Sequence, residues 1–301
     1  MELDLLEENK VFGKNSLSIF AKHVAKASNT DFSILLGGDS SSNYHTREGN
    51  TLKNRAGWWW TKSLRGDAVR IVGMNGYRSN YIDLCLVESR NGGIRPILSY
   101  PQIQSISSNV LRNASEIKEV ECGEYPQNIV DENYSRELER AYNNGSLKII
   151  GKNYTTDSVR YQDSDVIFKA RVHAEYEYNG QKYIRFVGDS NGEGKILSND
   201  RKIKKGKIYW VKVEPITWLV DLEHDIAITE KIIVSGIQFN NESNYTRDFK
   251  NTDIYKFMNT YLIKDMFNNT SINKEDDNNK EFVNIDSKIK TLRKRIDNIR
   301  K

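Results

Sequence analysis

The chain has 301 residues, and its 45 Lys and Arg residues against 41 Asp and Glu residues give a formal net charge of +4. This length allows one large domain or two ordinary ones, and 5 Trp, 16 Tyr and 10 Phe residues can fill a core, which excludes disorder throughout. No apolar run approaches the roughly 20 residues that a membrane-spanning helix needs, and two cysteines exclude a disulfide framework or a four-cysteine zinc site.

The first ten residues are acidic and lack the basic start and the apolar stretch of a secretory leader. We therefore expect a reducing compartment, with the cytoplasm as the default location and export by another route left open. We expect neither a cofactor nor a metal, because the four histidines lie far apart and no two of them have the spacing of metal ligands.

The first region, residues 1–112, has three consecutive tryptophans at 58–60 and the sequence GGIRP at 92–96. Between these two landmarks, short alternations of apolar and polar residues predict brief strands at 69–72 and 81–84. The stretch that follows is rich in Ser and Asn and predicts a connector over residues 99–117.

The second region, residues 118–268, begins with a predicted helix that Asp131 caps and Asn144-Gly145 ends. The apolar face of this helix has helical spacing and consists of Tyr134, Leu138, Ala141 and Tyr142. Further along, apolar runs predict strands at 207–213, 215–220 and 232–238, and the pattern then changes to a helix over 252–267. The apolar face of that helix consists of Ile254, Phe257, Met258, Tyr261 and Leu262.

A hairpin is predicted around Asn179-Gly180, because a two-residue type I′ turn requires positive φ at both positions. This turn would place Glu177 opposite Lys182, and Tyr176 opposite Tyr183 on the other face.

The last 33 residues divide into a polar segment at 269–281, which we expect to be a disordered linker, and a heptad pattern over 282–301. The apolar seam consists of Phe282, Ile285, Ile289, Leu292, Ile296 and Ile299. Lys288 and Arg293 would repel each other in a parallel dimer, so we favour docking of this helix on its own body. An acidic partner, an anionic surface and self-association in a structural or assembly role stay open.

Residues 285–301 alone have a net charge of +5, which leaves −1 for residues 1–284. We therefore expect no nucleic-acid binding by the main body.

Two local patterns could indicate catalysis. Residues 188–192 match the G-x-S-x-G pattern of a hydrolase with Ser190 as nucleophile, but the sequence that follows does not predict the helix that such an elbow requires. Cys122 lies between two carboxylates, which would raise the pKa of its thiol and reduce its reactivity. His173 falls in the hairpin and is expected to pack against the opposite strand.

The stretch between the tryptophans and the GGIRP sequence is rich in the residue types that recognition loops use. Its candidate ligand-binding residues are Arg65, Asp67, Arg70, Asn75, Tyr77, Arg78, Asn80, Tyr81, Asp83 and Arg90.

Several separate motifs resemble those of one bacterial domain family of unassigned function. Residues 59–63 (WWTKS) and 93–98 (GIRPIL) are similar to its WWLRS…GVRPAL ending. Residues 123–127 (GEYPQ) resemble its G-x-YPQ opening, and residues 214–220 (EPITWLV) resemble its P-I-x-W-R-V-L strand. Two further elements are similar to residues 29–32 (NTDF) and 251–259 (NTDIYKFMN).

That family is similar in fold to C-type lectins and to the formylglycine-generating sulfatase-modifying factors. The resemblance implies an α+β, C-type-lectin-like fold with short strands and two or three helices, here followed by a C-terminal helical tail. The order of the halves is exchanged, since the WW/GIRP half is residues 1–112 and the YPQ half is residues 118–268, which implies a circular permutation. We expect both halves to pack as one body with residues 99–117 as the joint; the alternative is two half-domains that each need an outside partner.

The resemblance implies a non-enzymatic binding module, since lectin-like targets of diversity-generating retroelements display a variable surface between these motifs. Its ligand would be an unknown protein or a small molecule, bound by the residues of 65–91 named above. Structural roles are implied for Trp59, Trp60, Arg95, Pro96, Tyr125, Pro126 and Trp218. The calcium-binding loops of the lectins are missing, and Cys85 and Cys122 do not match the cysteine pair of the formylglycine-generating enzymes.

Overall fold

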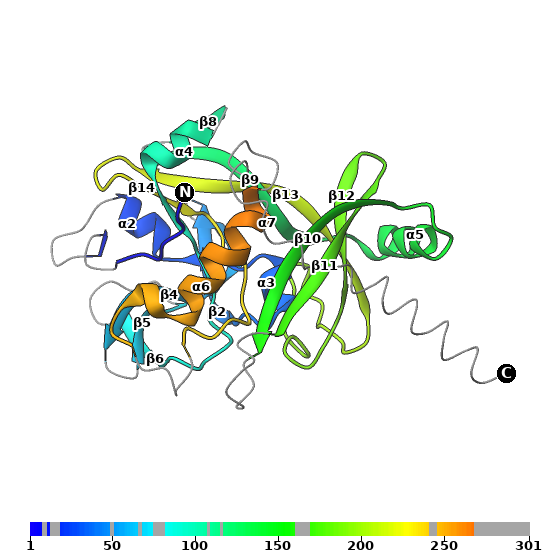
Figure 1. Cartoon of the computed structure of the whole chain (residues 1–301), viewed down its shortest axis with the longest axis horizontal. Coiled ribbons are helices and arrows are strands. Elements are labelled where there is room, and N and C mark those ends of the chain that lie inside the picture. Colours follow the sequence, from blue (N-terminus) through cyan, green and yellow to red (C-terminus); the bar gives the residue numbers. More distant parts are fainter. Residues whose placement is uncertain are drawn as a thin grey trace. The chain divides into compact units, whose positions relative to one another are not determined.

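The computed structural model describes residues 1–7, 11–12, 19–48, 51–65, 68–74, 82–106, 109–114, 117–159, 169–240 and 246–267. Met1–Phe267 form one compact unit. This unit is a mixed α+β structure in which mostly antiparallel sheets combine with short helices (Figure 1), and this confirms the predicted class. The linker and the heptad helix predicted after it lie outside the described residues. None of the helices described is long and apolar enough to cross a bilayer.

The largest sheet has eight strands among the residues described, and its main path runs β10-β11-β12-β13-β14-β7. These strands are β10 (Lys148–Val159), β11 (Lys169–Tyr178), β12 (Gln181–Val187), β13 (Ile208–Asp221), β14 (Ile226–Thr229) and β7 (Ile97–Ser99). Two more strands extend it off this path, because β9 (Ile117–Ile129) pairs with β13 and β8 (Asn109–Ala114) pairs with β9. β9, β10 and β13 have 12 to 14 residues each, where short strands were predicted.

The β11–β12 hairpin has the predicted register, with Glu177 opposite Lys182 and Tyr176 opposite Tyr183. Asn179 has a φ of 51° and Gly180 a φ of 77°, as a type I′ turn requires.

Two three-stranded sheets come from the first half of the chain. One has the order β1-β3-β2, with β1 (Ala27–Ser28), β2 (Ser40–Glu48) and β3 (Thr51–Gly57). The other has the order β4-β5-β6, with β4 (Trp59–Arg65), β5 (Ala68–Val72) and β6 (Ile82–Leu86). β5 and β6 confirm the brief strands predicted between the tryptophans and the GGIRP sequence.

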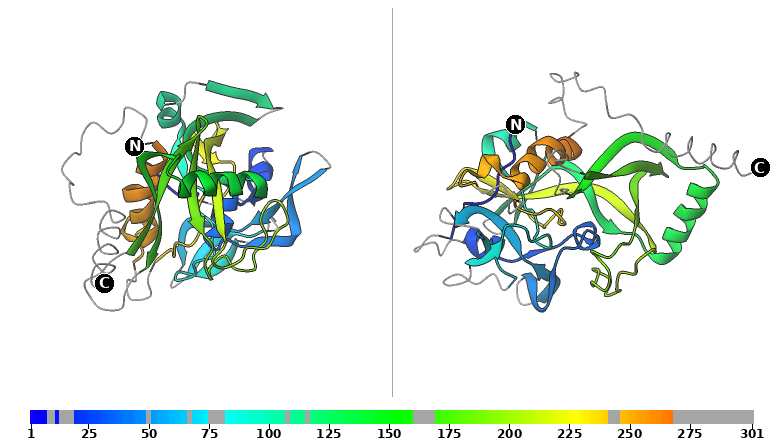
Figure 2. Two further views of the ribbon diagram at one scale, coloured as in Figure 1. Left: turned by 90° about the vertical axis from the view of Figure 1, so that its right-hand side faces the viewer. Right: turned by 60° about the horizontal axis from the view of Figure 1, so that its bottom comes forward.

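The helices are α2 (Ile19–Val24), α3 (Asp31–Leu35), α4 (Tyr100–Ile106), α5 (Glu132–Asn143), α6 (Asp253–Phe257) and α7 (Ile263–Phe267). Asp131 caps α5 as predicted, and its side chain accepts hydrogen bonds from the N–H groups of Asn133 and Tyr134. Figure 2 shows α5 across the strands β11, β12 and β13, well separated from α6 and α7.

The helix predicted at 252–267 is confirmed, with one irregular turn. A 3₁₀ turn (Phe249–Asn251) precedes α6, and the π-helical turn Met258–Leu262 joins α6 to α7 without a break. Of its predicted apolar face only Tyr261 is not fully buried.

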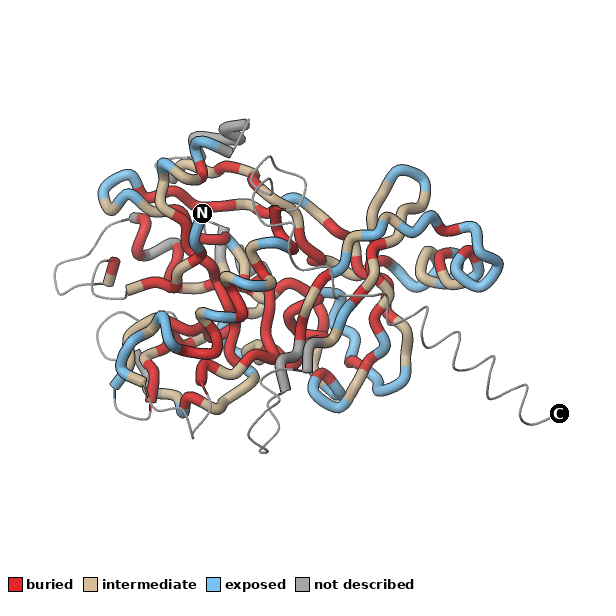
Figure 3. Tube along the Cα trace, viewed as in Figure 1, coloured by how far each residue is buried: buried red, intermediate tan, exposed pale blue. Residues whose placement is uncertain are grey.

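The main core contains residues from both halves of the chain, and Figure 3 shows the buried residues running through the middle of this compact unit. β7 from the first half pairs with β14 from the second, and Ile94 pairs with Val234. Near them, Ile232 donates its N–H to the Ser28 carbonyl and accepts from the Thr30 N–H. The backbone of the first half therefore completes the hydrogen bonding of the second.

The predicted connector at 99–117 contains regular structure, since α4 and β8 lie within it and Ile103 anchors α4 in the main core. Two other sequence predictions about this region are wrong. The strands predicted at 207–213 and 215–220 are one continuous strand, β13, because its partner β9 accommodates Pro215 with a bulge. Residues 232–238 form no regular strand, because their backbone partners are single residues of the first half.

Candidate ligand-binding site

The predicted binding stretch at 65–91 is only partly described. Asp67, Asn75, Tyr77, Arg78, Asn80 and Tyr81 lie outside the described residues, as does the side chain of Asp83, whose backbone lies in β6. Arg65 is exposed at the end of β4, and Arg70 is half-buried in β5. Arg90 is half-buried, and its Nε donates to the carbonyl of Gly236 at 3.2 Å.

A different site arises where the edge of β13 is left open. Residues 208–212 of β13 pair with β12 and residues 218–221 pair with β14. In the described sheet the residues between them, 213–217, pair with β9 only, on the other edge of β13. The side chain of Gln181 closes one end of this gap by donating to the Val213 carbonyl at 2.9 Å, and the N–H of Glu230 closes the other by donating to the Thr217 carbonyl at 2.9 Å.

Two bulges in β9 shape the same region. Pro215 pairs with Glu124 while Thr217 pairs with Glu121, so β9 has one extra residue there, next to Gly123 with its φ of 71°. A second extra residue lies between Pro126 and Ile129, which pair with residues only two apart in β13. The second bulge places Gln127 and Asn128 beside the open part of β13.

Hydrogen bonds hold these bulge residues in place. Gln127 Nε2 donates to the carbonyl oxygens of Glu214 and Pro215 at 3.1 and 2.6 Å. Asn128 donates both its backbone N–H and its Nδ2 to Oε2 of Glu214, at 3.2 and 2.6 Å. The GEYPQ and EPITWLV motifs therefore meet here.

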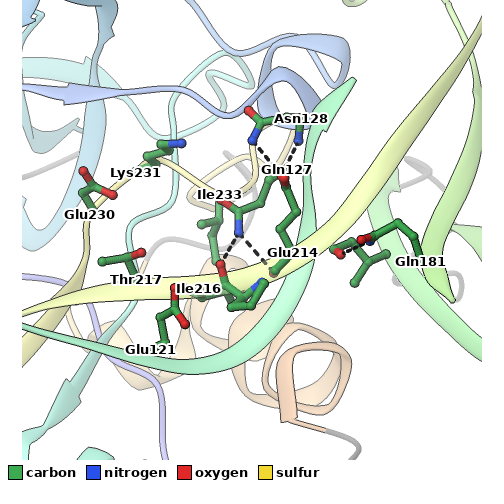
Figure 4. A pocket seen from close by; sticks show the side chains of 12 residues that line it. Glu121, Gln127, Asn128, Gln181, Glu214, Ile216, Thr217, Glu230, Lys231 and Ile233 are labelled. Atoms are coloured by element: carbon green, nitrogen blue, oxygen red, sulfur yellow. Dashed lines mark hydrogen bonds between the residues drawn. The ribbon is translucent and has the colours of Figure 1, made fainter. Parts of the chain in front are cut away.

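The result is a cavity of about 390 Å³ over the centre of β13 (Figure 4). Its apolar lining consists of Val213, Pro215, Ile216 and Ile233, and three of these four residues are buried. Its polar lining consists of Glu121, Gln127, Asn128, Gln181, Glu214, Thr217, Glu230 and Lys231. This combination of an apolar floor and a few converging polar groups is typical of ligand sites.

The polar lining is negatively charged. Glu121, Glu214 and Glu230 contribute three carboxylates against the single ammonium group of Lys231, a balance of −2. Glu230 is exposed at the rim, whereas Gln127 is 7% exposed. A ligand would therefore meet the carboxylate of Glu230 at the rim and the amide of Gln127 deeper inside.

Most cavity residues have no signal in the sequence that points to a binding site. Gln127 and Glu214 belong to motifs whose residues were given structural roles, and nothing in the local sequence of Gln181, Glu230 or Lys231 marks them. These residues are brought together only by the pairing of β13 with its neighbours.

The motif residues with predicted structural roles are all buried: Trp59, Trp60, Arg95, Pro96, Tyr125, Pro126 and Trp218. Trp218 Nε1 donates to the Cys122 carbonyl at 2.8 Å and so ties β13 to the first bulge. Arg95 donates to three backbone carbonyls, and its guanidinium lies 4.8 Å from the centre of the Trp59 ring. Burial lowers the pKa of Arg95, and the charge of Glu230 partly offsets this effect.

The catalytic patterns considered above have other surroundings in the fold. Ser190 is exposed and is followed by turns over 190–194, not by the helix that a nucleophile elbow requires. Burial, not the neighbouring carboxylates, raises the pKa of the Cys122 thiol to about 11. His173 is a packing residue, as predicted: its Nε2 lies 2.8 Å from the Thr156 hydroxyl, its ring stacks on Phe186, and burial lowers its pKa to about 3.

Two other groups of titratable side chains lie away from the cavity. At the β13–β14 turn, His224 Nδ1 is 2.7 Å from Oδ2 of Asp221, with Glu223 close by. In the core, Asp265 of α7 accepts a hydrogen bond from the Thr155 N–H at 2.6 Å, and burial raises the pKa of its carboxyl to about 8. Neither group lines the cavity.

No protein family model matches this chain, and comparisons with curated proteins and with solved structures found no match either.

Proposed function

We propose that the chain is a non-enzymatic binding module whose small polar ligand enters the cavity over β13. The observation that carries this proposal is the fixed arrangement of the polar lining. Three side-chain amides donate hydrogen bonds to protein oxygens: those of Gln127, Asn128 and Gln181. These bonds fix the positions of the three side chains before a ligand binds. Such preorganisation reduces the entropy that binding costs.

We also propose that the fold is a circularly permuted relative of the C-type-lectin-like family described above. Support comes from the burial of Trp59 and Arg95 from one half and Trp218 from the other within one compact unit. In this proposal the stretch 65–91, which begins at the exposed Arg65, is a second recognition surface.

The first experiment maps binding on the full chain by NMR, from backbone amide shifts on titration with a library of small polar compounds. We expect binders to shift the amides of Gln127, Asn128 and Thr217. Thr217→Trp fills the cavity and should abolish binding, whereas Thr260→Trp, the same substitution at an exposed helical position, should retain it.

Urea unfolding of both variants checks that each is folded. Binders that shift only amides outside the cavity, or that bind a folded Thr217→Trp variant normally, would exclude this site. Alanine replacements at Tyr77, Asn80 and Tyr81 test the second surface in the same titrations.

A further inference from the structure

The side-chain amides of the cavity determine whether a ligand must supply hydrogen-bond donors or acceptors. Gln127 Nε2 faces two backbone carbonyls, and Gln181 Nε2 faces the carbonyls of Lys182 and Val213 at 3.1 and 2.9 Å. Asn128 Nδ2 faces the carboxylate of Glu214. Carbonyl and carboxylate oxygens only accept hydrogen bonds, so all three amides must turn their NH₂ groups towards the protein. The carbonyl oxygens of these three amides are therefore the groups that can accept hydrogen bonds from a ligand.

Gln127 is the most informative of the three. Its side chain lines the cavity although the residue is only 7% exposed, and within the described residues its Oε1 has no hydrogen-bond partner. This oxygen is not one of the fully buried polar atoms without a partner, so it is open to the cavity. A hydrogen-bond donor of a ligand can therefore reach it.

The carboxylates add to this excess of acceptors. Oε2 of Glu214 takes both hydrogen bonds from Asn128, which leaves Oε1 for another donor. Glu121 and Glu230 bring the number of carboxylates to three, against Lys231 as the only ammonium group in the cavity lining. In the part of the chain that is described, Lys231 forms no ion pair with a carboxylate, so it does not neutralise the charges of Glu214 and Glu230.

The spread of the carboxylates favours a molecule over a single metal ion. Among the described residues, the one group of three potential metal ligands within 4.8 Å of one another is Asp221, Glu223 and His224, none of which lines the cavity. The acceptors of the cavity come from β9, β12, β13 and the segment after β14, around a space of about 390 Å³.

From these contacts we infer that the cavity takes a small molecule with a primary ammonium group, such as a polyamine or an amino sugar. The ammonium group would donate to Gln127 Oε1 and to the free oxygen of Glu214, and its charge would complement the −2 balance of the lining. The ammonium group of Lys231 would donate a hydrogen bond to one acceptor on the same ligand. This inference rests on the proposed function of the cavity.

Two sets of matched probes test it by calorimetry and NMR on the full chain. Putrescine, butane-1,4-diol and succinate are four-carbon chains that differ in their end groups. Glucosamine, glucose and glucuronate are pyranoses that differ in charge. We expect the ammonium member of at least one set to bind in the cavity more tightly than its neutral and anionic counterparts, and its affinity to fall as salt rises.

Glu214→Gln is the critical variant. The new amide oxygen can still accept from Asn128, while its NH₂ replaces the free carboxylate oxygen, so an acceptor becomes a donor with little change in shape. We expect this change to weaken binding of the ammonium probe about tenfold or more. Glu193→Gln removes the same charge from an exposed turn outside the lining and should change affinity less than about twofold.

The outcomes separate this inference from the proposed function. If neutral or anionic probes bind the cavity as tightly as the ammonium probes, or if Glu214→Gln leaves the affinity unchanged, the ammonium inference is wrong and the cavity remains a binding site. The inference is also wrong if library compounds shift the cavity amides but none of the ammonium probes does. If neither the probes nor the library shift them, both proposals fail.

Discussion

Replacement of Arg95 tests how the two halves of the chain are joined. Its guanidinium is fully buried and donates to the carbonyl oxygens of Thr229 at 2.9 and 2.6 Å, Val24 at 2.7 Å and Glu230 at 3.2 Å. One side chain of the GGIRP sequence thus satisfies acceptors from α2, from the last residue of β14 and from Glu230 directly after it. Arg95→Met keeps an unbranched chain over Trp59 but removes every donor.

The expected loss follows from the carbonyls left behind. Val24 and Thr229 are buried, whereas Glu230 is exposed and its carbonyl can be hydrated. Each buried acceptor without a partner costs about 1–3 kcal/mol. The substitution also removes the desolvation cost of the buried guanidinium, and this gain offsets part of the loss. We expect Arg95→Met to lower the free energy of unfolding by about 2–4 kcal/mol. Arg95→Lys should be intermediate, because one ammonium group cannot reproduce the planar fork of a guanidinium.

Urea unfolding with linear extrapolation measures these differences. Arg65→Met is the control, because Arg65 is exposed at the end of β4, and this substitution should change stability by less than about 0.5 kcal/mol. A loss below about 1 kcal/mol for Arg95→Met would mean that the carbonyls find other donors, and it would refute the role of Arg95 in joining the halves.

Two further predictions concern the core. The pKa of Asp265, about 8 in the fold against 3.8 when exposed, means that the stability from its protonated form is fully present below about pH 4 and is lost as pH rises through about 8. Asp265→Asn should therefore gain stability relative to the parent chain between pH 5 and pH 8, and urea midpoints that keep a constant difference would contradict this. A methyl group at Gly92 would lie 2.5 Å from Trp58 and 2.6 Å from Trp60, so Gly92→Ala should lower the free energy of unfolding by about 1–3 kcal/mol. An unchanged melting temperature would show that the two rings can move apart.

The sequence by itself determined the elements whose causes are local. Asp131 and the apolar spacing after it predict α5, since a cap and its helix lie within one stretch of chain. Asn179-Gly180 predicts the hairpin and its register, because two residues with positive φ define the turn. The burial of the tryptophans and of Arg95 was expected from the motif resemblance alone.

Only the tertiary structure decided the features whose partners are distant in the chain. Pro215 looked like the boundary between two strands, but the bulge of β9 and the amide of Gln127 accommodate it within β13. The cavity required β12 and β14 to leave the same stretch of β13 unpaired, so that Gln181 and Glu230 close its ends. Its residues come from four separate segments, each ordinary in its local sequence, and sheet pairing is what brings them together. Hydrogen bonds between distant strands do not appear in local periodicity, and for that reason the candidate site could not be predicted from the sequence.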